Sequence, residues 1–390
     1  MAPPLKLKLK ILFLLLTSYY LLATNCYAQS QKCVRVAIIQ DTATLRLKIG
    51  APYEAIDSLS NKILYRANSI NTTVTVYRDG ILLGNIQCRT NKLFIRSANP
   101  EAILIDGRKF RGDIQFIKKA NLHMSVINYI ELEDYIKGIL YHEVSHYWPM
   151  EALKAQALIS RTYAVYQVQE NGLKDFDVTS DIYSQVYGGL TSERYRTNKA
   201  VKETAGQILV YQEKVIPAYF HATCAGHTED ASLLWNIDLA PLKGVVCNFC
   251  KESPHFKWQE VLSKEELKEK LAHAGYKIKN IKDIAILGRD KSGRITDLKI
   301  ISTEKETKIP AKDFRNAVGP NVIRSTNFSV SIAGDDVVFE GVGWGHGAGL
   351  CQWGAYFMAK EGFSYKDILK YYYPGTEIKL LVTKNEAFRL

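Results

Sequence analysis

The stretch YHEVSHYWPMEALKAQALISRTYAVYQ, from Tyr141 to Gln167, contains a break in a helical pattern. Helical periodicity extends from Leu132 to Gln169, but Trp148-Pro149 interrupts it. A residue before proline is pushed towards extended geometry, whereas proline itself fits the first turn of a helix. The sequence therefore predicts a break followed by a helix from Pro149 to about Gln169. Because small and apolar residues dominate this helix, we expect it to be buried on most sides.

Within this stretch, His142, Glu143 and His146 form the string HExxH. On one continuous helix, that spacing places two imidazoles on one face to bind zinc, with the glutamate as general base. The break at Trp148-Pro149 disfavours a helix through both histidines, and no third ligand follows at the spacing of known zinc proteases. A zinc protease is therefore only the third hypothesis, and Glu143 acting alone at a loop–helix junction is preferred.

The segments on either side indicate an α+β fold. Short runs such as VRVAII, TLRLKIG and TTVTVYR predict a β-rich N-terminal module. From about Trp258 to Phe339, a charged amphipathic helix (SKEELKEKLAHAG) is followed by strands around the turn DKSGR. We expect a β-rich module at 29–125, a mixed α/β catalytic core at 126–257 and 337–390, and a smaller α+β subdomain inserted at 258–336.

The first 28 residues read as a secretory signal peptide, because three lysines precede an apolar run from Ile11 to Leu22. We expect cleavage after Ala28 and export to the periplasm or cell envelope. An uncleaved membrane anchor and a lipidated Cys26 are the alternatives. Cleavage removes the three lysines and no acids, so the formal charge falls from +11 to +8. A basic exported protein suits an anionic polymer such as cell wall, and we expect no nucleic-acid partner.

Four residues have the spacing of a structural zinc site: Cys224 and His227 form Cys-x-x-His, and Cys247 and Cys250 form Cys-x-x-Cys. Two such pairs supply the four ligands of tetrahedral zinc, with His221 as a substitute fourth ligand. Disulfide formation is an equally natural use of these cysteines in an exported protein. Either arrangement is structural, and no cofactor is expected for catalysis.

Five blocks in the chain resemble, in order, the stage II sporulation protein D family (SpoIID/LytB). The blocks are YIKGILYHEVSHYWPMEALKAQALISRTYA, SQVYGG, RTNKAVKETAGQILVY, YFHATCAGHTED and GWGHGAGLCQWGAYFMAKEGFSYKDILKYYYPGT. They extend from about Asn128 to Ile378 and match the inserted subdomain least. The resemblance implies a peptidoglycan lytic transglycosylase, which cleaves the MurNAc–GlcNAc bond and leaves 1,6-anhydroMurNAc ends during division, sporulation or recycling of the wall.

The family's Gly-x₄-Glu-x₄-Trp-Pro motif falls on Gly138, Glu143, Trp148 and Pro149. The resemblance therefore implies that Glu143 is the catalytic acid/base and that HExxH is a coincidence inside another motif. It also implies that the substrate is peptide-stripped glycan, with an N-acetylmuramoyl-L-alanine amidase acting first. A peptidoglycan-binding scaffold of an envelope or division complex, with little activity, is the second hypothesis.

Supporting residues are predicted from chemistry and from the family blocks. Lys154 and Arg161 lie seven residues apart and share a helix face, where they either pair with acids or face a substrate carboxylate. The glycines around His346 require close backbone approach or positive φ. His346 either contacts substrate or Glu143, or holds this loop, and Trp235 and Trp258 are expected in the core. The other candidates for sugar contacts are Ser184, Gln185, Tyr187, Trp344, Gln352 and Trp353.

Overall fold

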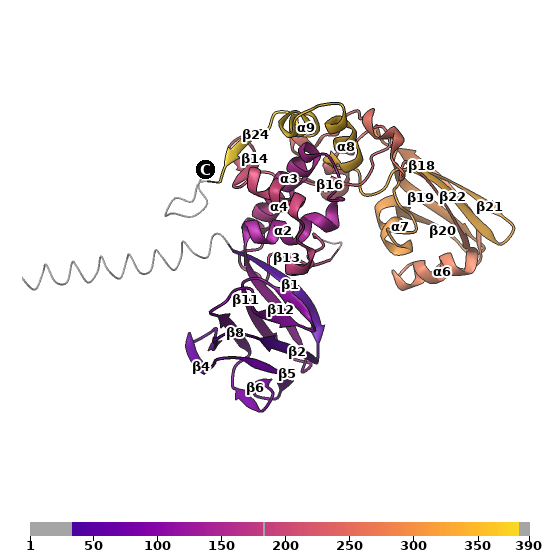
Figure 1. Cartoon of the computed structure of the whole chain (residues 1–390). Coiled ribbons are helices and arrows are strands. Elements are labelled where there is room, and N and C mark those ends of the chain that lie inside the picture. Colours follow the sequence, from indigo (N-terminus) through magenta and orange to yellow (C-terminus); the bar gives the residue numbers. More distant parts are fainter. Residues whose placement is uncertain (1–32, 182–183, 382–390) are drawn as a thin grey trace, which may run out of the picture.

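A computed structural model describes residues 33–181 and 184–381. Figure 1 shows a β-rich part formed by the beginning of the chain, a helical middle part and a second β-containing part to one side. The predicted signal peptide and Cys26 lie outside the described residues. Within the described ranges, no helix combines the length and apolar character needed to cross a membrane. The α+β class predicted from the sequence is confirmed.

The N-terminal part consists of two mainly antiparallel sheets that share one hydrophobic core. The seven-stranded sheet has the order β13 (Val178–Thr179), β1 (Cys33–Thr42), β12 (Met124–Glu131), β11 (Asp113–Lys118), β8 (Lys92–Ser97), β3 (Tyr53–Asp57) and β4 (Lys62–Ala67). The six-stranded sheet has the order β10 (Arg108–Phe110), β9 (Ile103–Ile105), β2 (Thr44–Ile49), β5 (Ile70–Tyr77), β6 (Gly80–Leu83) and β7 (Ile86–Cys88). Alternate residues of β2, Leu45, Leu47 and Ile49, are buried in this core, as expected for a strand with one covered face.

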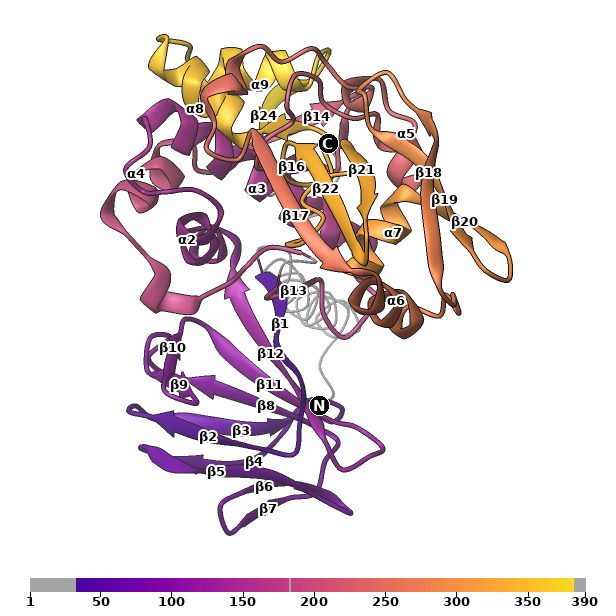
Figure 2. The ribbon, with the colours of Figure 1, turned by 90° about the vertical axis from the view of Figure 1, so that its right-hand side faces the viewer.

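The N-terminal sheets are continuous with the helical part rather than separated from it by a linker. Strand β12 leads directly into α2 (Leu132–Glu143). Strand β13, which follows α3 (Met150–Glu170), pairs in parallel with β1. The positions of β12 and α2 are visible in Figure 2. Residues of α2 and of the sheets belong to the same apolar cluster. Helix α2 is therefore fixed in position by its packing against the N-terminal sheets.

Helix α3 (Met150–Glu170) begins directly after Pro149, so the predicted break and helix are confirmed. Its Leu153 and Ala157 join the core of the β-rich part, while Leu158 and Ile159 join a second core with the C-terminal helices. Burial on most sides is thus also confirmed. Helix α3 contacts α4 (Tyr195–Glu203), α8 (Gln352–Lys360), α9 (Tyr365–Tyr372), β14 (Gln207–Tyr211) and β15 (Lys214–Val215). The other elements outside the N-terminal sheets and the inserted part are α5 (Ala231–Trp235), β16 (Phe220–His221), β23 (Leu350–Cys351), β24 (Glu377–Leu380), and the 3-10 turns η1 (Gly189–Ser192), η2 (Ala240–Leu242) and η3 (Phe249–Glu252).

The remaining part has its own apolar core and projects from the helical part (Figures 1 and 2). Its first strand, β17 (Lys257–Ser263), pairs antiparallel with its last, β22 (Asp336–Val342), so the chain enters and leaves on neighbouring strands. Its other elements are β21 (Phe328–Ala333), β18 (Ile281–Arg289), β19 (Ile295–Ser302), β20 (Glu306–Pro310), α6 (Lys264–His273) and α7 (Ala311–Val318). Ser263 caps α6 by accepting a hydrogen bond from the Glu266 N–H.

Candidate active site

The turn between α2 and α3 presents Glu143 as the last residue of α2. The next residue, Val144, is extended, and the N–H of Trp148 donates to the Ser145 carbonyl within the turn. Because the helix ends at Glu143, His142 and His146 do not share a helix face. His142 Nε2 instead lies 2.6 Å from Ser192 Oγ. The zinc-binding geometry of an HExxH helix is therefore absent at these residues.

Partial burial governs the chemistry of Glu143. Desolvation raises the pKa of its carboxyl from 4.5 to about 7, and a hydrogen bond from the Val186 backbone N–H opposes the rise. No charged side chain in 33–181 or 184–381 contributes to this shift. The position of Glu143 at the negative end of the α2 dipole also disfavours its charged form. A carboxyl group in this setting can hold a proton near neutral pH and release it when the local charge changes.

Tyr163, on α3, interacts electrostatically with Glu143 and was not identified from the sequence. Its side chain hydrogen-bonds with Ser184 and Gln167, and burial together with the negative charge of Glu143 raises its pKa. Ser184 also accepts from the Thr179 N–H at 3.1 Å. Ser184 therefore lies in the surroundings of Glu143 through Tyr163, with its hydroxyl already in a local network.

Gln185 and Tyr187 are buried and act inside the protein. Gln185 accepts from the Tyr135 hydroxyl at 3.1 Å, and the Tyr187 hydroxyl donates to Asn128 Oδ1 at 2.9 Å. The two side chains flank Val186, whose N–H bonds to Glu143. They are thus placed to fix a backbone donor to the carboxylate, and their 1% exposure leaves little surface for a sugar.

The turn that carries Glu143 is clamped from two directions. Arg196, on α4, donates to the backbone carbonyls of His146 and Trp148, each at 2.9 Å. Gln352, at the start of α8, donates to the backbone carbonyl of Glu143 at 3.2 Å. Gln352 is only 8% exposed, and its amide also donates to Gln156 Oε1 on α3 at 3.4 Å. The hydrogen bond to the Glu143 carbonyl connects Gln352 with a residue that lies 209 positions earlier in the chain.

An aromatic cluster adjoins the same turn. Trp148, Trp353 and Tyr356 lie with their ring centroids 5.1 Å apart in every pair. The ring of His255 lies between two tryptophans, with its centroid 6.1 Å from that of Trp353 and 4.7 Å from that of Trp344. Trp344 and Trp353 are both partly exposed, which leaves ring surface available to a ligand. Tyr356 and His255 were not identified from the sequence.

The glycine-rich loop turns with positive φ and approaches other chain segments closely, as its composition predicts. Gly345, Gly347 and Gly349 have φ of 109°, 93° and 71°. A Cβ on Gly349 would lie 1.9 Å from the Tyr219 carbonyl oxygen. His346 Nδ1 accepts from the Ala348 N–H at 3.1 Å, and burial together with the charges of two nearby arginines lowers its pKa to about 3. His346 is therefore neutral and supports its own loop.

The two other tryptophans differ in burial. Trp258 is 6% exposed and belongs to the core of the inserted part, as predicted. The same prediction is wrong for Trp235, which is 38% exposed. Trp235 instead packs its ring against Tyr219 at 4.2 Å and His346 at 5.0 Å, so it covers the loop that carries His346.

Both helix cations proposed for substrate binding are paired with acids, which is the other alternative open from the sequence. Lys154 Nζ lies 2.9 Å from both Glu151 and Glu203. Arg161 has no exposed side-chain surface and makes two hydrogen bonds to Glu133, at 2.8 and 2.9 Å. Lys154 and Arg161 thus stabilise the packing of α3 on its neighbours, and Arg161 offers no surface to a ligand.

The cysteine cluster differs from the predicted zinc ligands in one member. Cys224, Cys247 and Cys250 do come together, but the fourth sulfur is that of Cys351, and all four are buried. His227 lies outside the group, because its Nδ1–H donates to the Thr228 carbonyl at 2.6 Å. The substitute ligand, His221, is likewise directed elsewhere: its Nδ1 lies 3.1 Å from the Ala348 carbonyl oxygen.

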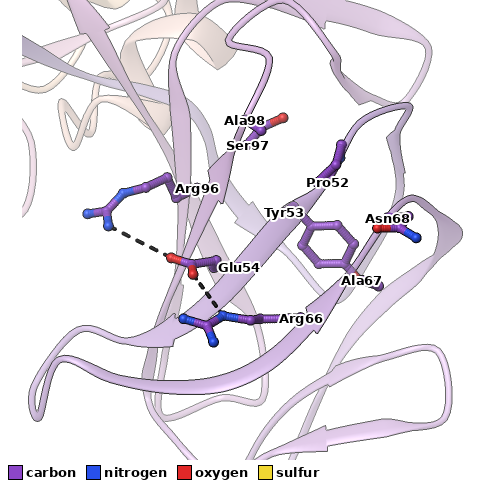
Figure 3. Close-up of a pocket in the computed structure, with 9 residues that line it drawn as sticks. All are labelled: Pro52, Tyr53, Glu54, Arg66, Ala67, Asn68, Arg96, Ser97 and Ala98. Atoms are coloured by element: carbon purple, nitrogen blue, oxygen red, sulfur yellow. Dashed lines mark hydrogen bonds and ion pairs between the residues drawn. The ribbon is translucent and has the colours of Figure 1, made fainter.

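A hollow of about 620 Å³ lies in the N-terminal sheets, away from Glu143 in the chain (Figure 3). Its charged lining residues are Glu54, Arg66 and Arg96, drawn in Figure 3. Arg66 Nε is 2.8 Å from Glu54 and Arg96 is 4.0 Å from it, so each arginine of the lining has an acidic partner. None of the site residues predicted from the sequence lines this hollow.

Two segments of the chain match known protein families. Residues 120–211, which include Glu143, match the family described as Stage II sporulation protein. Residues 242–349, which contain the inserted part, match a domain of unknown function, DUF8618.

Several relatives resemble a large share of the chain. A Brachyspira hyodysenteriae protein described as uncharacterized is 36% identical over 350 residues, covering 90% of this chain and 93% of that protein. Stage II sporulation protein D of Bacillus subtilis is 33% identical, covering 64% and 74%. The amidase enhancer of Bacillus subtilis is 28% identical, and the match covers 83% of this chain and 52% of that protein. These matches confirm the resemblance carried by the sequence blocks, and the chain belongs to the stage II sporulation protein D family.

Proposed function

We propose that this protein is a peptidoglycan lytic transglycosylase in which Glu143 is the single acid/base. The observation that carries the proposal is the raised pKa of Glu143, which burial brings to about 7 without a charged partner among the described residues. A group with this pKa is populated in both protonation states near neutral pH, as a residue that first donates and then accepts a proton must be.

The proposed reaction uses one carboxyl group twice. Protonated Glu143 donates its proton to the oxygen between MurNAc and GlcNAc as the bond from C1 to that oxygen breaks. The resulting carboxylate, held by the Val186 N–H, then accepts the proton of the muramic C6 hydroxyl as that oxygen bonds to C1. The product is a 1,6-anhydroMurNAc end, Glu143 is protonated again, and no water is consumed. Ordinary glycosidases need a second carboxylate, which this route does not.

The surroundings of Glu143 fit a sugar polymer. Trp344 and Trp353 offer partly exposed rings on which sugar faces can stack. The exported, basic protein predicted from the sequence suits an anionic wall. The similarity to an amidase enhancer supports a functional link to an amidase, which would strip stem peptides before Glu143 acts.

The test is digestion of intact and peptide-stripped peptidoglycan side by side, with mass analysis of the released fragments. We expect anhydro-ended fragments from the wild-type protein, more of them from stripped glycan, and a loss of roughly 10²–10⁴-fold or more in Glu143→Gln. Asp134→Asn is the matched control, because Asp134 lies on the same helix and pairs at the surface with Lys137. Its release should equal that of the wild type.

Two outcomes would contradict the proposal. Undiminished release by a folded Glu143→Gln variant would remove Glu143 from the chemistry. Wall binding without anhydro products, from both the wild type and Glu143→Gln, would instead support a peptidoglycan-binding scaffold.

A further inference from the structure

We infer that Cys224, Cys247, Cys250 and Cys351 form a tetrathiolate site for one zinc ion that fixes the glycine-rich loop and the start of α8. The four Sγ atoms all lie within 4.8 Å of one another, and each residue is buried. Zn–S bonds of about 2.3 Å in a tetrahedron place sulfurs about 3.8 Å apart, which is the spacing that this cluster approaches. Cys224 Sγ and Cys250 Sγ, for example, are 3.5 Å apart.

The backbone around the cluster supplies the hydrogen bonds that metal-bound thiolates attract. The N–H groups of Cys224 and Gly354 each point at Cys351 Sγ, at 3.3 Å. The Tyr372 hydroxyl lies 3.1 Å from Cys247 Sγ. Such second contacts orient ligands and offset the charge of sulfur. Cys351 therefore has the environment of a ligand, although no Cys-x-x-Cys or Cys-x-x-His pattern includes it.

Local geometry explains why Cys224 and not His227 joins the cluster. Ala225 and Gly226 both have positive φ, 63° and 116°, so the chain reverses directly after Cys224. The Cys247 N–H donates to the Gly226 carbonyl at 2.8 Å, which brings the second pair of cysteines against this turn. His227 continues away from the sulfurs and pairs with Val246 in an isolated bridge.

The ion would join three segments of the chain. Cys224 follows β16, Cys247 and Cys250 precede the inserted part, and Cys351 follows its return strand. A zinc ion here closes the base of the insertion. Cys351 also caps α8 and directly precedes Gln352, which donates to the Glu143 carbonyl. The link to Glu143 rests on the proposed function, whereas the metal site itself does not.

The decisive measurement is the metal content of protein purified without chelator, before any assay of activity. We expect one equivalent of zinc in the wild type and in His227→Ala, and a loss of zinc in Cys351→Ser. Cys88→Ser is the matched control, since Cys88 is buried in the N-terminal core, away from the cluster in the fold. Zinc well below one equivalent in the wild type, or retention in Cys351→Ser with loss in His227→Ala, would overturn the site.

A second measurement keeps the inference testable if Cys351→Ser does not fold. Chelation of the wild type should lower its Tm, and added zinc should restore it, because bound metal stabilises only the folded state. Thiol titration of the denatured, unreduced wild type should find all four cysteines free. Two disulfides in place of zinc would refute the site. Neither readout depends on glycan cleavage, so failure here leaves the proposed function to be judged separately.

Discussion

The two ends of α2 carry two glutamates in opposite electrostatic situations. Glu133, in the first turn, lies at the favourable end of the helix dipole and receives two hydrogen bonds from the buried Arg161. Glu143, ten residues later, ends the helix without a charged partner among the described residues, and its pKa rises to about 7. The same residue type on one helix thus stabilises the fold where its charge is compensated and becomes suited to proton transfer where it is not.

Breaking the ion pair of Glu133 with Arg161, at the start of α2, should lower the stability of the protein most. We expect Arg161→Met to lower the free energy of unfolding by about 3 kcal/mol, because the Gln207 carbonyl and the Glu133 carboxylate, whose side chain is 33% exposed, lose their donor. Urea unfolding measures this change, and a double-mutant cycle with Glu133→Gln isolates the pair. A loss below about 1 kcal/mol, with a raised KM for glycan, would show that Arg161 serves the substrate instead.

The uncompensated end should be stabilised when its charge is removed. A carboxyl whose pKa is raised in the folded protein contributes stability below about pH 4.5 and loses it as pH rises through 7. Glu143→Gln has no such loss, so its stability relative to the wild type should increase between pH 4.5 and 8, by at most about 3 kcal/mol. Thermal unfolding across this range measures the gain.

The same titration should appear in the activity. Since the first step needs a protonated Glu143, the rate of glycan cleavage should fall as pH rises above about 7. Asp134→Asn, which removes a charge from the same helix at a partly exposed ion pair, should show neither the pH-dependent gain in stability nor a shift of the rate profile. A stability difference between Glu143→Gln and the wild type that is flat across this pH range would mean that the Glu143 pKa is not raised.

Local sequence predicted the parts of this site that depend on neighbouring residues. Proline geometry at Pro149 correctly separated α2 from α3, and the family motif singled out Glu143. Cys351 was missed because it meets Cys224 across 127 residues, and no local spacing encodes that contact. His227 was chosen for its spacing, but the turn after Cys224 directs it away.

The acidic partners of Lys154 and Arg161 also could not be predicted from the local sequence pattern. Seven-residue spacing correctly indicates that Lys154 and Arg161 lie on similar sides of α3, but not what they meet. Glu133 and Glu203 come from α2 and the end of α4, and only tertiary packing brings them to α3.

Lys154 provides the smallest expected effect and the sharpest contrast with Arg161 on the same helix. Its Nζ is 2.9 Å from both Glu151 and Glu203, and hydrogen bonds to these two acids raise its pKa. Its side chain retains 18% exposure and both acids are more exposed, so water screens the pairs. Lys154→Met should therefore cost about 1 kcal/mol or less, with glycan cleavage unchanged. Urea unfolding measures the stability and the fragment assay measures cleavage, each beside Arg161→Met. A loss of cleavage at unchanged stability would show that Lys154 binds the substrate.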